Sequence, residues 1–100
     1  MKSEIEQLIN NSAEIIKKTS SLSGEIQKVI NEIIRCLKNG NKVILFGNGG
    51  SAADAQHIAA EFIGRFELER KSLAAIALTT DASVITSLSN DYDYDVVFSR

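Results

Sequence analysis

Proline and tryptophan are absent from the sequence, and cysteine and histidine each occur once. A single cysteine cannot form an internal disulfide, so Cys36, on the apolar side of an expected helix, is most simply a small core residue. No apolar run is long enough to span a bilayer, and the polar residues after Met1 do not form a signal peptide. These absences predict a cytoplasmic protein with no membrane partner.

An excess of positive charge is also lacking. The eleven Lys and Arg residues are spread along the chain and are outnumbered by thirteen Asp and Glu residues, for a net charge of -2. Without a basic patch, no nucleic-acid partner is expected. The hydrophobic share of 44% and the charged share of 24% are ordinary for one small globular domain.

The spacing of apolar residues predicts helices followed by alternating strands and helices. The expected helices cover residues 3–22, 24–38, 52–62 and 83–88, and the expected strands, both buried on two faces, cover 42–46 and 73–78. The expected caps are Gly40 after the second helix, capping boxes at Ser3 with Glu6 and at Ser51 with Asp54, and Asp81 or a neighbouring threonine before the last helix.

The order strand–helix–strand predicts an α/β fold with a parallel sheet. Residues 1–40 are expected to form a helical segment that packs on the domain and on partner subunits, and residues 41–100 the first part of the sheet domain. Two strands do not make a stable parallel sheet, and the residues from about Val96 are typical of the first turn of another helix. We therefore expect the sequence to stop inside a domain, after the second strand.

The run Gly47-Asn48-Gly49-Gly50-Ser51 joins the first strand to a helix. Backbone N–H groups and the positive end of the helix meet there, which favours a phosphate. A Walker A loop is excluded because no lysine follows Gly50, and a dinucleotide loop fits poorly because its acidic residue is missing from the second strand's end. A sugar-phosphate loop, with side-chain hydrogen bonds from Asn48 and Ser51, remains beside a turn that only connects the two elements.

The next helix carries His57 and Glu61, four residues apart and pointing away from its core face. That core face is expected to comprise Ala55, Ile58, Ala59 and Phe62. The pair is either a solvated His–Glu contact or two ligands of a divalent metal such as zinc, or Glu61 is a general base beneath a substrate. A catalytic zinc takes about three protein ligands, so the others must come from another chain or from beyond Arg100.

Residues 90–95 are expected to form a polar loop after the last helix. Ligands of open parallel sheets lie beyond the carboxyl ends of the strands, so Asn90 and Asp91 are expected to meet the glycine turn. The alternative is that they only end the helix. Tyr92 and Tyr94 are assigned no chemistry.

Taken together, these motifs resemble the phosphoheptose isomerase family within the sugar-isomerase (SIS) domain proteins. The matching segments are FGNGGSAADAQH at 46–57, AEF at 60–62, GRF at 64–66, AIALTTD at 75–81, NDY at 90–92 and VFSR at 97–100. The resemblance implies a flavodoxin-like three-layer sandwich and a homotetramer with active sites between subunits. It also implies isomerisation of D-sedoheptulose 7-phosphate to D-glycero-D-manno-heptose 7-phosphate through an enediol, the first step of bacterial heptose biosynthesis.

The resemblance also assigns roles to individual residues. It implies that the substrate is bound by Asn48, Gly49, Gly50, Ser51, Glu61, Asn90 and Asp91. His57 and Glu61 would hold one zinc per subunit, and Glu61 would be the catalytic acid/base. Because the remaining zinc ligands and the partner acid/base are expected beyond Arg100, the 100 residues alone are expected to lack isomerase activity.

Two other functions stay open. One is a non-enzymatic SIS protein that binds the replication initiator, whose Phe-x-x-Glu-Arg connection resembles Phe66 to Arg70; Glu61 favours the isomerase because that protein lacks an acid at this position. The other is a sugar-phosphate sensing module, which would bind a ligand without turnover.

Overall fold

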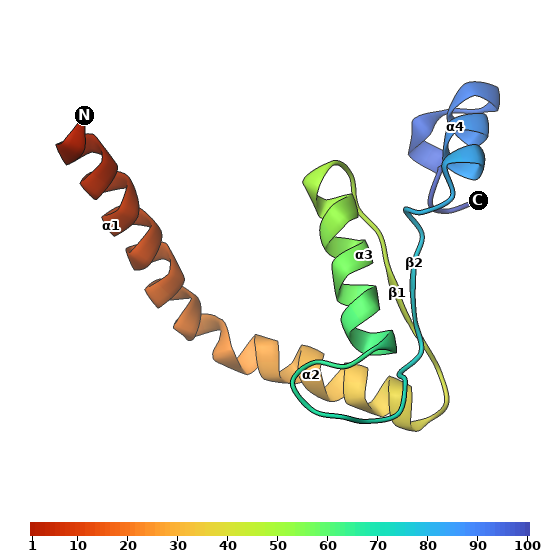
Figure 1. The fold of residues 1–100 in the computed structure, drawn as a ribbon, viewed down its shortest axis with the longest axis horizontal. Helices are drawn as coiled ribbons and strands as arrows, with labels where there is room; N and C mark the ends of the chain where they lie inside the picture. The colour runs from red at the N-terminus through yellow and green to blue at the C-terminus, as the bar shows by residue number, and fades with distance from the viewer. The chain divides into compact units, whose positions relative to one another are not determined.

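The computed structural model describes all residues from 1 to 100, which form two compact units, Met1–Arg35 and Cys36–Arg100 (Figure 1). None of the helices combines the length and the apolar character needed to cross a membrane.

The N-terminal residues are helical throughout, as the apolar spacing predicts. Helix α1 (Lys2–Lys18) continues through a 3₁₀ turn, η1 (Thr19–Leu22), into α2 (Ser23–Lys38). The hydroxyl of Thr19 donates a hydrogen bond to a backbone carbonyl four residues back, at 3.0 Å. Such back-bonding distorts α geometry, which accounts for the 3₁₀ turn inside the stretch expected as one helix.

The capping box expected at Ser3 and Glu6 is wrong. Helix α1 begins at Lys2 with Met1 as its N-cap, and no side chain caps it. At the end of α2 the expectation is confirmed: Gly40 has a φ of 77° and its N–H bonds to the carbonyl of Leu37 at 3.1 Å. A left-handed residue at this position favours glycine.

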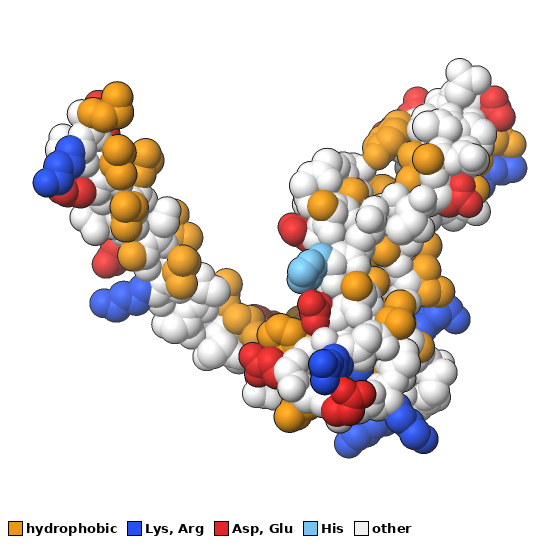
Figure 2. All heavy atoms as spheres, in the orientation of Figure 1, with side chains coloured by type: hydrophobic (Ala, Val, Ile, Leu, Met, Phe, Trp, Pro, Cys, Tyr) orange, Lys and Arg blue, Asp and Glu red, His pale blue; other side chains and the backbone are white.

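Neither α1 nor α2 buries any residue. Figure 2 shows hydrophobic side chains running along one side of α1. The exposed large apolar residues of α1 are Ile5, Leu8, Ile9, Ile15 and Ile16, and those of α2 are Ile26, Val29, Ile30 and Ile34. An amphipathic helix with an uncovered apolar stripe is typical of a surface that packs against another element.

The second unit contains the sheet. Its elements are β1 (Val43–Leu45), α3 (Gly50–Ile63), β2 (Ala75–Ala77), α4 (Ala82–Asp91) and a 3₁₀ turn, η2 (Tyr94–Val96). Strands β1 and β2 are parallel neighbours, with Val43 opposite Ala75 and Leu45 opposite Ala77. The predicted α/β class with parallel pairing is therefore confirmed.

Helix α3 covers one face of the two strands (Figure 1), where Ala55, Ala59 and Ala75 are buried. On the other face Ile44 and Ile76 are 49% and 45% exposed, so burial of both strands on two faces is wrong here. Ile58 is also exposed rather than part of the core face, since it lies beside the unpaired edge of β1. A second helical layer, as a three-layer sandwich requires, stays a prediction.

Both strands are shorter than predicted, at three residues each, and each has a single neighbour in the two-stranded sheet. Helix α4, in contrast, is longer than predicted. Asp81 caps it by accepting a hydrogen bond from the N–H of Val84 at 2.9 Å, which confirms the expected start. The helical hydrogen bonds continue to Tyr92, so Asn90 and Asp91 are helical residues and the loop expected over 90–95 is wrong.

We expect that the isolated 100-residue polypeptide does not persist as a folded monomer. Its buried hydrophobic residues are only Ala55, Ala59, Ala75 and Val97, and a two-stranded sheet over so small a core gives little stability. Size-exclusion chromatography with light scattering, followed by urea unfolding, tests this. A monomer that unfolds in one cooperative transition would contradict it.

Candidate functional site

The turn between β1 and α3 is closed by its glycines rather than by a side chain. Gly49 is the N-cap of α3, with a φ of 55° that glycine adopts readily. Its carbonyl accepts hydrogen bonds from the N–H groups of Ala52 and Ala53, at 3.1 and 3.4 Å. The capping box expected at Ser51 and Asp54 is therefore wrong, because the backbone of Gly49 already occupies the cap.

Gly47 is needed for a different reason. A Cβ atom placed on it would lie 2.7 Å from the Cβ of Ser51 and 3.0 Å from the Ser51 carbonyl carbon. The chain just after β1 thus runs directly against the first turn of α3, and any side chain at this position would push the two apart.

This turn presents free hydrogen-bond donors. The N–H of Ser51 bonds back to the carbonyl of Asn48 at 2.9 Å, whereas the N–H groups of Gly49 and Gly50 have no partner in the protein. They lie at the N-terminus of a 14-residue helix, where the helix dipole favours negative charge. The geometry suits an anionic or hydroxyl oxygen.

Asn48 links the turn to a distant segment. The hydroxyl of Tyr94, on η2, donates a hydrogen bond to Oδ1 of Asn48. Asn90 and Asp91, which were expected to reach the turn, make a 3.3 Å hydrogen bond to each other instead and are exposed. The segment after α4 thus contacts the glycine turn through Tyr94, whereas Asn90 and Asp91 make no hydrogen bond to it.

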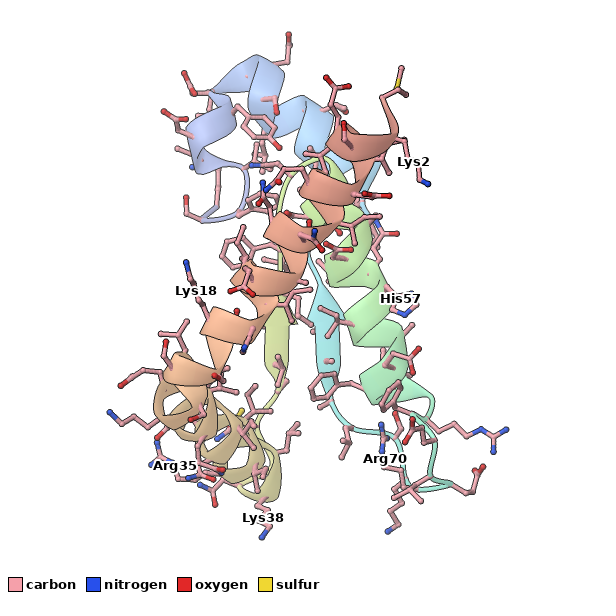
Figure 3. The ribbon with its side chains drawn as sticks, turned by 90° about the vertical axis from the view of Figure 1, so that its left-hand side faces the viewer. Lys2, Lys18, Arg35, Lys38, His57 and Arg70 are labelled. Atoms are coloured by element: carbon pink, nitrogen blue, oxygen red, sulfur yellow. The ribbon has the colours of Figure 1, made fainter.

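His57 and Glu61 form a pair on α3. Nε2 of His57 lies 3.4 Å from Oε1 of Glu61, and their side chains are 77% and 37% exposed. Figure 3 shows His57 pointing away from the strands. Two tetrahedral zinc ligands, each about 2.0–2.2 Å from the metal, lie roughly 3.3–3.6 Å apart. The pair fits two positions of such a site, but no cluster of three potential ligands exists in the chain.

Arg70, labelled in Figure 3, binds backbone carbonyls at the C-terminal end of α3, the end that carries Glu61. Its guanidinium donates to the carbonyl of Glu61 at 2.7 Å and to that of Phe62 at 3.0 Å. It also reaches the carbonyls of Gly64 and Lys71, at 3.3 and 3.0 Å. A cation at a helix C-terminus satisfies the last carbonyls and complements the dipole.

The sequence-predicted site residues thus fall into three groups. Asn48 to Ser51 lie in one turn, His57 and Glu61 form one pair on the helix that the turn begins, and Asn90 and Asp91 lie apart at the end of α4. Sequence reasoning missed Tyr94 and Arg70. A lone arginine in a charged connection has no sequence pattern that marks its role. Tyr94 has such a mark, because it follows a strand and its helix and so lies beyond the carboxyl end of that strand, where ligands bind.

Residues 7–100 match the family model of the SIS domain. The chain is 50% identical over its whole length to the phosphoheptose isomerase of Aquifex aeolicus, of which it covers 53%, and 58% identical over 80 residues to that of Synechocystis sp., of which it covers 41%. A solved phosphoheptose isomerase from Francisella tularensis is similar with a TM-score of 0.90 at 35% identity, over 97% of this chain and 51% of that one. The chain spans about half the length of these relatives.

We expect Arg70→Lys in the complete protein to lower the free energy of unfolding by about 1–2 kcal/mol, because an ammonium group cannot hold the same set of carbonyls. Urea unfolding gives this number, and amide hydrogen exchange should quicken in the last turn of α3. The matched control is Arg65→Lys, which changes only an exposed 2.8 Å pair with Glu69 and should cost less than about 0.5 kcal/mol. Equal losses in the two variants would contradict the role of Arg70.

Proposed function

The chain belongs to the SIS domain family, and on that basis we propose that the complete protein converts D-sedoheptulose 7-phosphate to D-glycero-D-manno-heptose 7-phosphate, the first step of heptose biosynthesis. One observation carries the proposal: a turn with free N–H donors and the His57–Glu61 pair lie on the same helix, α3. The turn can hold substrate oxygens, and the pair supplies a carboxylate for proton transfer. The relatives' shared name supplies the substrate class.

In this proposal Asn48, Gly49, Gly50 and Ser51 bind the sugar phosphate. Gly49 and Gly50 contribute backbone donors, and Asn48 and Ser51 contribute polar side chains. Asn90 and Asp91, the last two residues of α4, form a second substrate-binding segment, and α4 lies at the same end of the strands as the glycine turn (Figure 1). Glu61 is eleven residues from Gly50, roughly 16 Å along the helix axis. One substrate molecule can contact both groups only if it is elongated. Otherwise the glycine turn of one active site and its carboxylate come from different subunits.

The chemistry moves one proton between neighbouring carbons. A base removes a proton from carbon 1 of the ketose, and the electron pair left behind forms the enediol as the carbonyl oxygen on carbon 2 takes up a proton. A proton then returns at carbon 2 while the hydroxyl on carbon 1 loses its own, which leaves the aldehyde. We assign the base to Glu61, a half-buried carboxylate held beside His57.

Zinc, one ion per subunit, belongs to this proposal. Its support is the 3.4 Å separation of Nε2 of His57 and Oε1 of Glu61, which suits two ligands of one metal ion. When bound, zinc would polarise the substrate or hold the assembly together. Because the remaining ligands and the partner acid/base are expected beyond Arg100, we expect no turnover from these 100 residues alone.

A cytoplasmic homotetramer is the assembly we propose. The apolar faces of α1 and α2 support it, since residues such as Leu8 and Ile9 are more than 60% exposed. Surfaces of this kind are covered in stable oligomers.

A second function keeps one observation in its favour. Phe66 and Leu68, in the connection that resembles the initiator-binding protein, are 64% and 74% exposed. Such side chains suit contact with another protein. In that case the complete protein would bind the replication initiator and would not depend on Glu61.

We expect Glu61→Gln in the complete protein to lower kcat by about 10²–10⁴-fold, because the amide cannot accept the proton. Turnover of sedoheptulose 7-phosphate is the measurement. Asp54→Asn is the control, since it makes the same acid-to-amide change on the same helix at a carboxylate that forms no ion pair with His57, which pairs with Glu61. Full activity of Glu61→Gln would remove Glu61 from the mechanism, and no activity in the unaltered protein would favour the binding function.

We expect His57→Ala to reduce bound zinc from about one ion per subunit to much less at micromolar free zinc, because one of about three protein ligands is lost. The measurement is elemental analysis after chelation and reloading of the complete protein. Asp54→Asn should keep the zinc content of the unaltered protein. Unchanged zinc in His57→Ala would exclude His57 as a ligand.

A further inference from the structure

Tyr94 makes a contact that the proposed chemistry does not yet use. Its hydroxyl donates a hydrogen bond to Oδ1 of Asn48, across 46 residues of sequence. This bond is the direct polar link between η2 and the glycine turn. Tyr92, two residues earlier, makes no hydrogen bond through its hydroxyl, and its ring lies under the guanidinium of Arg100, 4.1 Å from the centroid.

The backbone around Tyr94 is fixed from both sides. Asp93 caps η2 by accepting a hydrogen bond from the N–H of Asp95 at 2.9 Å. On the other side Val97 is buried, and the ring of Phe98 packs on that of Phe46 with centroids 5.1 Å apart. Phe46 directly precedes the glycine turn. The tyrosine is therefore held in place by the residues that border the turn it contacts.

In the hydrogen bond from Tyr94 the oxygen end of the Asn48 amide is bonded and its nitrogen end is free. An asparagine side chain offers one acceptor oxygen and an NH₂ group with two donors. Because the oxygen of Asn48 accepts from Tyr94, the NH₂ group remains, and Nδ2 makes no hydrogen bond within the protein. The same turn exposes the unpartnered N–H groups of Gly49 and Gly50. The free polar groups of Asn48, Gly49 and Gly50 are thus all hydrogen-bond donors. A phosphate or hydroxyl oxygen requires donors of this kind.

Without the tyrosine hydroxyl, the side-chain amide of Asn48 could flip and direct its oxygen, instead of its NH₂ group, toward the ligand. Two acceptor oxygens cannot hydrogen-bond to each other, so that orientation would repel a phosphate oxygen. We propose that Tyr94 is a positioning residue that orients Asn48 as a hydrogen-bond donor to the oxygens of the sugar phosphate. This inference rests on the proposed function, because it takes the glycine turn as the substrate site.

The test is steady-state kinetics of the complete protein with sedoheptulose 7-phosphate. Tyr94→Phe keeps the ring and removes the hydroxyl, so KM should rise about three- to tenfold, as for the loss of one hydrogen bond, with kcat nearly unchanged. Tyr92→Phe is the matched control and should leave both constants as they are. In an Asn48→Ala background, Tyr94→Phe should have no further effect on KM, because the group that it positions is gone.

A readout without substrate accompanies the kinetics. In ¹⁵N spectra, the side-chain NH₂ resonances of Asn48 should shift in Tyr94→Phe and not in Tyr92→Phe. Equal KM values for the two variants, or a Tyr94→Phe effect that persists in Asn48→Ala, would overturn the positioning role while leaving the isomerase intact. Absence of turnover in the unaltered protein would overturn the proposed function itself, and the positioning role with it.

Discussion

The close approach of Gly47, two residues after β1, to the first turn of α3 is the constraint on which the site depends. Only a residue without a side chain fits there, because a Cβ would lie 2.7 Å from that of Ser51. Gly49 then turns the chain with a φ of 55°, so that the helix starts immediately. The free N–H groups, the position of Asn48 and the direction of α3 all follow from these two glycines.

Helix α3 lies on the strands through small side chains, and this explains why polar contacts matter at its ends. Ala55, Ala59 and Ala75 allow a close approach, but each buries little apolar area. Burial of one CH₂ group contributes only about 0.8 kcal/mol to stability. Near its start, the hydroxyl of Thr79 donates to the carbonyl of Ala52 at 3.4 Å. At its end Arg70 holds the last carbonyls. The helix that carries the His57–Glu61 pair is thus held at both ends by residues on either side of β2, Arg70 before the strand and Thr79 after it.

The order of helices and strands could be predicted from the sequence because each element has a local pattern of apolar and capping residues. Apolar spacing marks the helices, short apolar runs mark the strands, and Asp81 marks the start of α4. Ends were predicted less well, since they depend on competing hydrogen bonds. The serine after the glycine turn looks like an N-cap, yet Gly49 fills that position through its backbone, and the turn after α4 begins later than Asn90 suggests.

The contacts that complete the site lie beyond such patterns. Tyr94 reaches Asn48 across 46 residues, and the four carbonyls held by Arg70 become neighbours only when the connection after α3 folds back. Periodicity locates a residue on its own element, but it cannot say which distant group that residue will meet. Substrate-contacting residues in such a fold are therefore easier to anticipate than the residues that orient them, because a ligand pocket follows from strand and helix ends while its supports follow from the packed chain.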